Sequence, residues 1–76
     1  MSINSEKALG ILQSEYNRLV AEGIDSENAR DFLGKDAFSL EAFSSWSPSS
    51  IRQAKNELLS LGFIEENVLG ECKLAV

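Results

Sequence analysis

The segment from Leu58 to Ile64, which reads Leu-Leu-Ser-Leu-Gly-Phe-Ile, constrains the fold of this chain more than any other. Upstream of it, apolar residues recur at the three- and four-residue spacing of a helix face: Ile51, Ala54, Leu58 and Leu61. Gly62 suits the left-handed position just past a helix, and Phe63 can then pack back onto Leu58. The segment therefore predicts a helix from Pro48 to Leu61 that stops at Gly62. We expect three side chains to be buried together: Leu58, Leu61 and Phe63.

The residues after Gly62 predict a two-stranded hairpin. One strand is expected at Phe63–Glu66, and a turn at Asn67–Gly70, where Asn and Gly both tolerate positive φ. Glu71–Val76 is the second expected strand, since it alternates with a period of two. The residues expected on its inner face are Cys72, Leu74 and Val76.

The segment before the long helix predicts a second, shorter one. Ser47 can cap the helix that starts at Pro48, where the missing N–H of proline costs nothing. Ser39 can likewise cap a short helix over Leu40–Ser45, after a brief extended piece at Ala37-Phe38. Trp46, in the turn between the two helices, is expected to cover the core.

The N-terminal residues 1–34 predict two more helices. The first spans Ser5–Glu22, capped by Ser5, with an apolar stripe of Ala8, Leu9, Leu12, Tyr16, Leu19 and Val20. Gly10 inside it is expected to mark a close contact. The second runs from about Glu27 to Leu33, capped by Asp25 or Ser26, with Ala29, Phe32 and Leu33 facing inward.

Length and composition bound the class of protein. The 76 residues suffice for one domain with a small core, so a second copy of the chain is a candidate partner. A single cysteine and no histidine leave no internal disulfide and no structural zinc site. We find no nucleophile–base pair and no glycine-rich phosphate loop, so we expect no enzymatic activity, cofactor or metal.

The start of the chain lacks the pattern of a signal peptide, and no apolar run approaches the roughly 20 residues of a membrane span. A cytoplasmic protein without a membrane partner is expected.

The stretch from Phe38 to Glu66 resembles the winged helix-turn-helix family. It reads Phe-Ser-Leu-Glu-Ala-Phe-Ser-Ser-Trp-Ser-Pro-Ser-Ser-Ile-Arg-Gln-Ala-Lys-Asn-Glu-Leu-Leu-Ser-Leu-Gly-Phe-Ile-Glu-Glu. Winged-helix repressors and replication initiators show a similar short helix, serine-rich turn and Leu-Gly-Phe-Ile helix end. The resemblance implies a single, mainly α domain with a small C-terminal β-hairpin. Its parts would be N-terminal helices at 1–34, a helix-turn-helix at 38–62 and a wing hairpin at 63–76.

The resemblance also implies a surface that binds double-stranded DNA. In a helix-turn-helix, the N-terminal part of the second helix meets base edges in the major groove. The outward positions of that helix are Ser49, Ser50, Arg52, Gln53 and Asn56, and their side chains suit guanine, adenine and phosphate. Lys55 and, on the hairpin, Lys73 are expected to contact phosphate. An ordinary solvated helix face has the same composition. The leading hypothesis is a small regulator of transcription or replication, of the kind that mobile elements encode.

The charge distribution supports an alternative of another class. The chain carries 12 acidic and 7 basic side chains, a net charge of −5. Residues 1–44 hold eight acids and four bases, and the expected wing carries Glu65, Glu66 and Glu71. A field of this sign repels phosphate and speeds encounter with a basic protein. The alternative is an acidic winged-helix factor that does not bind DNA: an inhibitor, an anti-defence protein or a nucleic-acid mimic. Its partner would be a basic nucleic-acid-handling protein, contacted through Glu27, Asp31 and Asp36.

Overall fold

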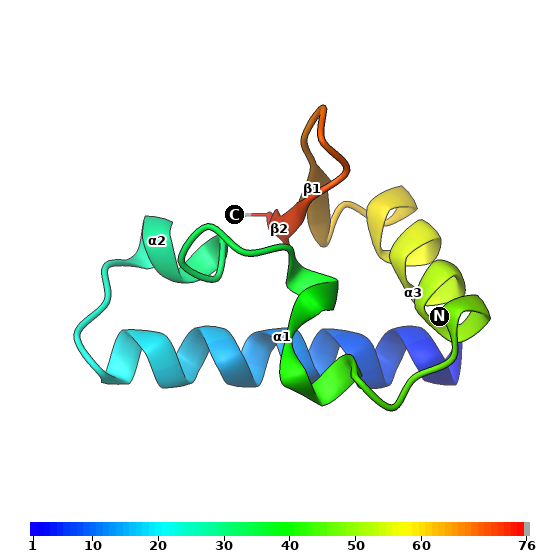
Figure 1. Cartoon of the computed structure of the whole chain (residues 1–76), viewed down its shortest axis with the longest axis horizontal. Helices are drawn as coiled ribbons and strands as arrows, with labels where there is room; N and C mark the ends of the chain where they lie inside the picture. Colours follow the sequence, from blue (N-terminus) through cyan, green and yellow to red (C-terminus); the bar gives the residue numbers. More distant parts are fainter. Residues whose placement is uncertain (76) are drawn as a thin grey trace.

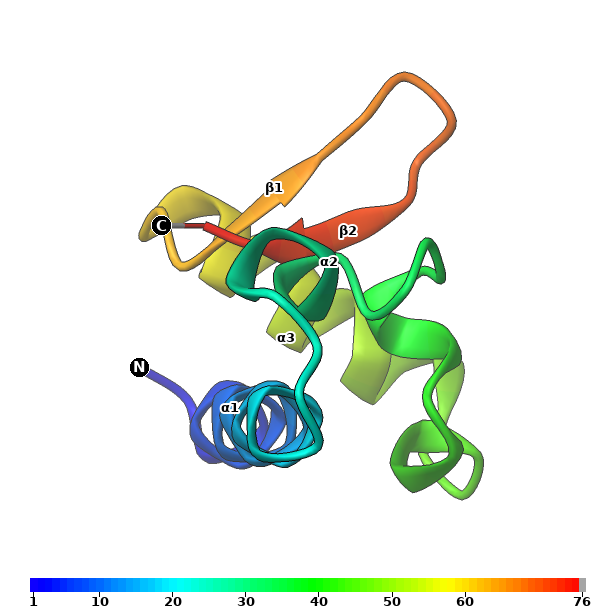
Figure 2. The ribbon, with the colours of Figure 1, turned by 90° about the vertical axis from the view of Figure 1, so that its left-hand side faces the viewer.

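A long N-terminal helix carries shorter elements on one side, and a C-terminal hairpin lies beyond them (Figure 1). The computed structural model describes residues 1–75, so Val76, the expected end of the second strand, lies outside the described residues. In chain order the elements are α1 (Ile3–Ala21), α2 (Ser26–Arg30), the 3-10 turns η1 (Ala37–Ser39) and η2 (Glu41–Phe43), α3 (Pro48–Ser60), β1 (Ile64–Glu66) and β2 (Cys72–Leu74). Viewed along α1, α2 and α3 separate that helix from the hairpin (Figure 2). The prediction of a mainly α chain with a C-terminal hairpin is confirmed.

Helix α1 begins earlier than expected. Ser2, not Ser5, is its cap: the Ser2 hydroxyl accepts a 3.1 Å hydrogen bond from the Ser5 backbone N–H. Ser5 itself is buried in the first turn, where its hydroxyl accepts a 2.9 Å bond from Ser2 Oγ. The Ser2 backbone N–H also donates a 2.6 Å bond to Oε1 of Glu57 on α3. The start of α1 is therefore capped locally by Ser2 and also tied to α3.

The apolar stripe of α1 is largely confirmed. Its buried members are Ala8, Leu12 and Leu19, and Leu9 and Tyr16 are half-buried against them. Val20 is exposed, because it lies about 100° around the helix from Leu19. The expected close contact at Gly10 is wrong, since a Cβ built there meets nothing within 4 Å.

Helix α2 is shorter than expected, and a left-handed turn follows it. Asp25 caps it by accepting a 3.2 Å bond from the Asn28 backbone N–H. The chain then takes positive φ at Phe32 (55°), Leu33 (59°) and Gly34 (85°). This reversal buries Phe32 and turns Leu33 out to solvent, so the expected burial of Leu33 is wrong.

The segment between α2 and α3 differs most from expectation. Ala37-Phe38 is not extended, and Leu40–Ser45 is not an α-helix capped by Ser39; both regions form single 3-10 turns. Asp36 is held in place from far along the chain, because its Oδ1 accepts a 2.7 Å bond from the Cys72 backbone N–H. Phe43 is buried, with the rings of Phe38 and Trp46 each 5.1 Å away between centroids. The predicted role of Trp46 in covering the core is confirmed.

Helix α3 begins and ends where its capping and stop residues predict. Ser47 caps it by accepting a 3.2 Å bond from the Ser50 backbone N–H, and Pro48 is its first residue. At the other end Gly62 has φ of 80°, and the Phe63 backbone N–H donates a 3.0 Å bond to the Leu58 carbonyl.

The expected joint burial at the end of α3 is wrong. Leu58 is fully buried, but Leu61 is 54% and Phe63 40% exposed. Within residues 1–75, no element covers the Leu61 side chain at the C-terminal cap of α3.

Strands β1 and β2 pair antiparallel, with Ile64 opposite Leu74 and Glu66 opposite Cys72. Cys72 and Leu74 are buried in the same core as the helices, as the alternation predicted, and Ile64 is buried with them. The turn is held by Asn67, whose side-chain Oδ1 accepts bonds from the backbone N–H groups of Leu69 (2.9 Å) and Glu71 (3.0 Å).

Candidate nucleic-acid interface

Three of the predicted DNA-reading residues share the outer face of α3. Ser49, Arg52 and Asn56 follow one another at three- and four-residue spacing, opposite the buried Ala54 and Leu58, and all three are exposed. Arg52 forms no ion pair with residues 1–75, so its guanidinium is available to a ligand. This face has the residue types that read base edges, but only one positive charge.

Two others are hydrogen-bonded within the protein, Gln53 to the start of α1 and Ser50 to the cap of α3. Gln53 Oε1 accepts a 2.9 Å bond from Nδ2 of Asn4. Ser50 is half-buried, and its hydroxyl accepts a 2.9 Å bond from Ser47 Oγ. Both side chains therefore have partners inside the protein.

Both lysines that were predicted to contact phosphate are paired with carboxylates of the hairpin. Lys55 Nζ lies 2.5 Å from Glu66 Oε2, and it donates a 3.4 Å bond to the Gly70 carbonyl. The hydrogen bond to Glu66 raises the pKa of Lys55. Lys73 Nζ lies 3.9 Å from Glu65 Oε2. Binding to phosphates depends on cations that neutralise them, and here two of the three candidate cations are already neutralised.

The three acids of the alternative hypothesis do not form one site. Glu27 is exposed on α2 and lines a different pocket from Asp31 and the hairpin glutamates. Asp31 Oδ1 accepts a 3.1 Å bond from the Gly34 backbone N–H. Asp36 is half-buried and, through its bond to Cys72, has a structural role.

Asp31 nevertheless joins an acidic surface that includes the hairpin. A cleft of about 340 Å³ lies between the turn after α2 and the hairpin. Its charged lining residues are Asp31, Lys35, Glu65, Glu66, Glu71 and Lys73. We call Asp31 and the three hairpin glutamates, together with the turn residues Val68 and Leu69, the hairpin surface.

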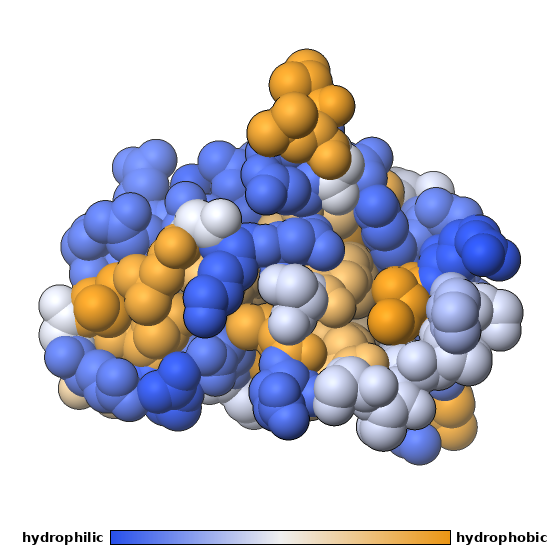
Figure 3. Space-filling model, viewed as in Figure 1, coloured by the Kyte–Doolittle hydropathy of each residue, from blue (hydrophilic) through white to orange (hydrophobic). Residues whose placement is uncertain are grey.

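The tip of the hairpin is apolar, which sequence reasoning missed. Val68 is fully exposed and Leu69 is 79% exposed. Figure 3 shows an apolar knob at the top of the molecule, directly above hydrophilic residues; other apolar patches lie lower on the same face. The signal was present as two large aliphatic residues inside a turn, where Ser, Asn, Asp and Gly are usual. Single exposed apolar residues are common on protein surfaces, whereas this pair is adjacent and lies at the tip of the hairpin.

Comparison of the chain with protein-family models, with curated proteins and with solved structures found no match. Within residues 1–75, no helix combines the length and the apolar character needed to cross a bilayer. The same residues hold no cluster of three carboxylate or thiol groups placed to bind a metal ion.

Proposed function

We propose that this protein acts by binding another protein through the hairpin surface. The observation that carries the proposal is an apolar tip, Val68 and Leu69, on a hairpin whose lysine is paired with its own carboxylate. In this proposal the chain is a winged-helix variant, with η2 and α3 as the helix-turn-helix and the hairpin as the wing. The order of these elements and the stop at Gly62 support that assignment.

The tip has the properties of a binding anchor. Transfer of an exposed Val or Leu side chain into a pocket contributes about 1.5–3 kcal/mol. The two hydrogen bonds that Asn67 Oδ1 accepts hold the turn in one conformation before binding. A preorganised loop loses less entropy when it docks, so more of the contact energy appears as affinity.

The charges around the tip define the chemistry of the partner. Asp31, Glu65, Glu66 and Glu71 line this surface with Lys35 and Lys73, and Lys55 of α3 pairs with Glu66, so the acids keep a small excess. Its complement is an apolar pocket rimmed by lysine and arginine, and basic surfaces of this kind are typical of proteins that handle nucleic acid. The partner class is therefore the basic protein expected from the net charge, but it meets the hairpin and not the α2 face.

The test is capture of partners from the native host extract, with and without nuclease. We expect the unmodified chain to retain a basic protein after nuclease treatment, and the V68S/L69S variant to lose it. The matched control is V20S/L61S, which removes an exposed Val and Leu from other faces. Retention of the same partner by V68S/L69S, or its loss on nuclease treatment alone, would contradict the proposal.

DNA binding through α3 is the second candidate. It is favoured by the shared outward face of Ser49, Arg52 and Asn56, of which Ser49 and Arg52 lie near the capped start of the helix. The experiment is titration of the chain against a pool of random duplexes at low salt. The absence of binding at high protein concentration would exclude this function.

A further inference from the structure

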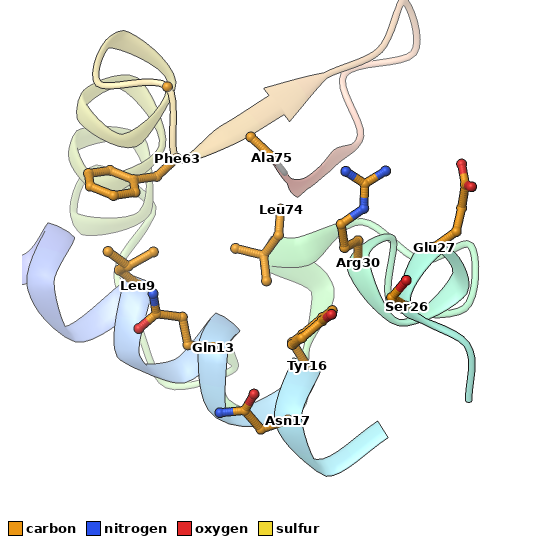
Figure 4. Close-up of a pocket in the computed structure, with 11 residues that line it drawn as sticks. Leu9, Gln13, Tyr16, Asn17, Ser26, Glu27, Arg30, Phe63, Leu74 and Ala75 are labelled. Atoms are coloured by element: carbon orange, nitrogen blue, oxygen red, sulfur yellow. The ribbon is translucent and has the colours of Figure 1, made fainter. Parts of the chain in front are cut away.

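Two hollows lie along different sides of α1. One, of about 780 Å³, lies beside Arg30, between α1, α2 and the C-terminal strand (Figure 4). Leu74 lies in its middle, with polar side chains from both helices around it: Gln13, Asn17, Ser26 and Glu27. The other hollow is a groove of about 970 Å³ between α1 and residues 40–46, which we call the α1 groove. Its apolar side chains make it the better candidate for a docking site.

The α1 groove has an apolar surface that the rest of the chain leaves uncovered. Ile11 on the α1 wall is only half-buried, as are Leu40 and Trp46 on the opposite wall. The Trp46 indole packs edge-on against the Phe43 ring, 5.1 Å away between centroids, and it also lines the groove. Ala42, on the same wall, is exposed. A half-exposed tryptophan in a hollow is typical of the centre of a protein–protein interface.

Gly10 lines the same groove, and packing within the chain does not explain it. A glycine in the interior of a helix costs about 0.5–1 kcal/mol relative to alanine. A Cβ built at Gly10 meets no atom within 4 Å, so no described residue needs the side chain to be missing. The glycine instead leaves the backbone of α1 open to the groove, where an element of another molecule can approach it closely.

The charges of the groove favour a second copy of the chain as its occupant. The chain as a whole has a net charge of −5, which opposes self-association, but the charged residues of the groove cancel: Lys7, Glu15, Arg18 and Glu41. Arg18 is paired with Glu15, whereas Lys7 and Glu41 form no ion pair within residues 1–75. Lys7 stands on the α1 wall and Glu41 on the opposite wall. Each is therefore the partner that the other requires in a second copy.

We propose that the α1 groove is the interface of a two-fold homodimer. With the symmetry axis along the groove, the α1 wall of one copy faces residues 40–46 of the other, so every contact occurs twice. Trp46 and Leu40 pack against the partner's α1 at Gly10, and Lys7 pairs with Glu41 across the interface. The groove shares no lining residue with the hairpin surface or with the outer face of α3, so the dimer presents two copies of each.

The test is sedimentation velocity of the full chain over a range of concentrations, where we expect a reversible equilibrium between monomer and dimer. Lys7→Glu and Glu41→Lys should each weaken dimerisation about tenfold, because each places like charges opposite one another. The double variant K7E/E41K keeps the net charge of −5 and should restore the affinity. An effect of net charge alone predicts a different result, since Glu41→Lys would then dimerise more strongly than the unmodified chain.

Three further variants separate the interface from the fold. Gly10→Ala should stabilise the diluted monomer, because alanine favours the helix, and yet weaken dimerisation. Ala42→Glu places a charge inside the groove and should dissociate the dimer. The matched control is Ser45→Glu, at an exposed position outside the groove lining, which should leave the dimer intact. A chain that stays monomeric at every concentration its solubility allows, failure of K7E/E41K to restore the dimer, or equal dimerisation of Ala42→Glu and Ser45→Glu would each overturn the proposal.

Discussion

Lys55 on α3 and Glu66 on β1 form an ion pair that joins the helix to the hairpin and removes a cation from the candidate DNA surface. Both side chains are about one-third exposed, at 29% and 35%. Solvent therefore screens the pair, and its main effect is on the charge that this surface presents to a ligand. This charge decides whether the surface favours DNA or a basic protein.

Neutralising the hairpin glutamates should slow association with a basic protein and strengthen binding to DNA. The variant E65Q/E66Q frees Lys55 and Lys73 and removes two negative charges from the net −5. We expect slower association with a basic partner, and stronger nonspecific binding to duplex DNA. Binding kinetics at two salt concentrations measure both. The control E6Q/E41Q makes the same charge change on α1 and η2, and equal effects of the two variants would show that only net charge matters.

Arg52 should decide whether α3 reads DNA. If the chain binds a duplex, Arg52→Ala should weaken specific binding by about 1–3 kcal/mol and relax the base preference. Fluorescence anisotropy on a selected duplex measures this loss. Lys7→Ala provides the control, because it removes one positive charge from another helix, α1. A selected duplex that binds Arg52→Ala as tightly as the unmodified chain would argue against base reading by α3.

Leu58 and Leu61 should differ sharply in their effect on stability. Leu58 is fully buried, so Leu58→Ala should lower the free energy of unfolding by about 2–5 kcal/mol. Leu61→Ala at an exposed position should change it by less than about 0.5 kcal/mol. Urea denaturation followed by circular dichroism measures both values. Similar losses for the two variants would mean that α3 packs differently.

Gly10 and Gly62 should respond to alanine with opposite signs. Gly10 lies in the interior of α1 with open space around it, so Gly10→Ala should stabilise the protein by about 0.5–1 kcal/mol. Gly62 has φ of 80°, where a Cβ is strained, so Gly62→Ala should destabilise it by about 1–2 kcal/mol. Thermal unfolding of the two variants is the measurement. A destabilised Gly10→Ala would indicate a contact on α1 formed by another molecule.

Cys72 should be unreactive in the folded protein. Burial raises the pKa of its thiol from 9.0 to about 11, so the neutral thiol prevails at pH 8. Alkylation by iodoacetamide at pH 8 should be slow in buffer and fast in urea. Because the pKa is higher in the folded state, the stabilisation that it contributes is complete below pH 9 and is lost as the pH rises through about 11. Rapid alkylation in buffer would show that the strand around Cys72 opens readily.

The helix-capping and turn residues in the sequence predicted the ends of α3 and the position of the hairpin well. Ser47 with Pro48 and Gly62 with its following residues form contacts within a few positions, which propensity rules describe. The segment from 37 to 45 could not be predicted in this way. Its turns depend on Asp36, whose partner Cys72 lies 36 positions away.

The candidate sites could likewise be predicted only where their residues are close together in the sequence. The residue types on the outer face of α3 were predicted, because helical spacing alone places Arg52 and Asn56 there. The pairing of Lys55 with Glu66 and the pocket beside Arg30 were not, because each brings together elements that are separate in the sequence. The tip residues Val68 and Leu69 were visible but were assigned only to a turn.

Helix α1 is joined to the C-terminal half of the chain by packing and by the hydrogen bond from Ser2 to Glu57. Helix α1 supplies Ala8, Leu12 and Leu19 to the core that also holds Leu58 and Leu74. A fragment beginning at residue 38 would keep the α3 face and the hairpin but would leave that core open to water. These surfaces therefore need an apolar helix face against them, which α1 supplies in this chain.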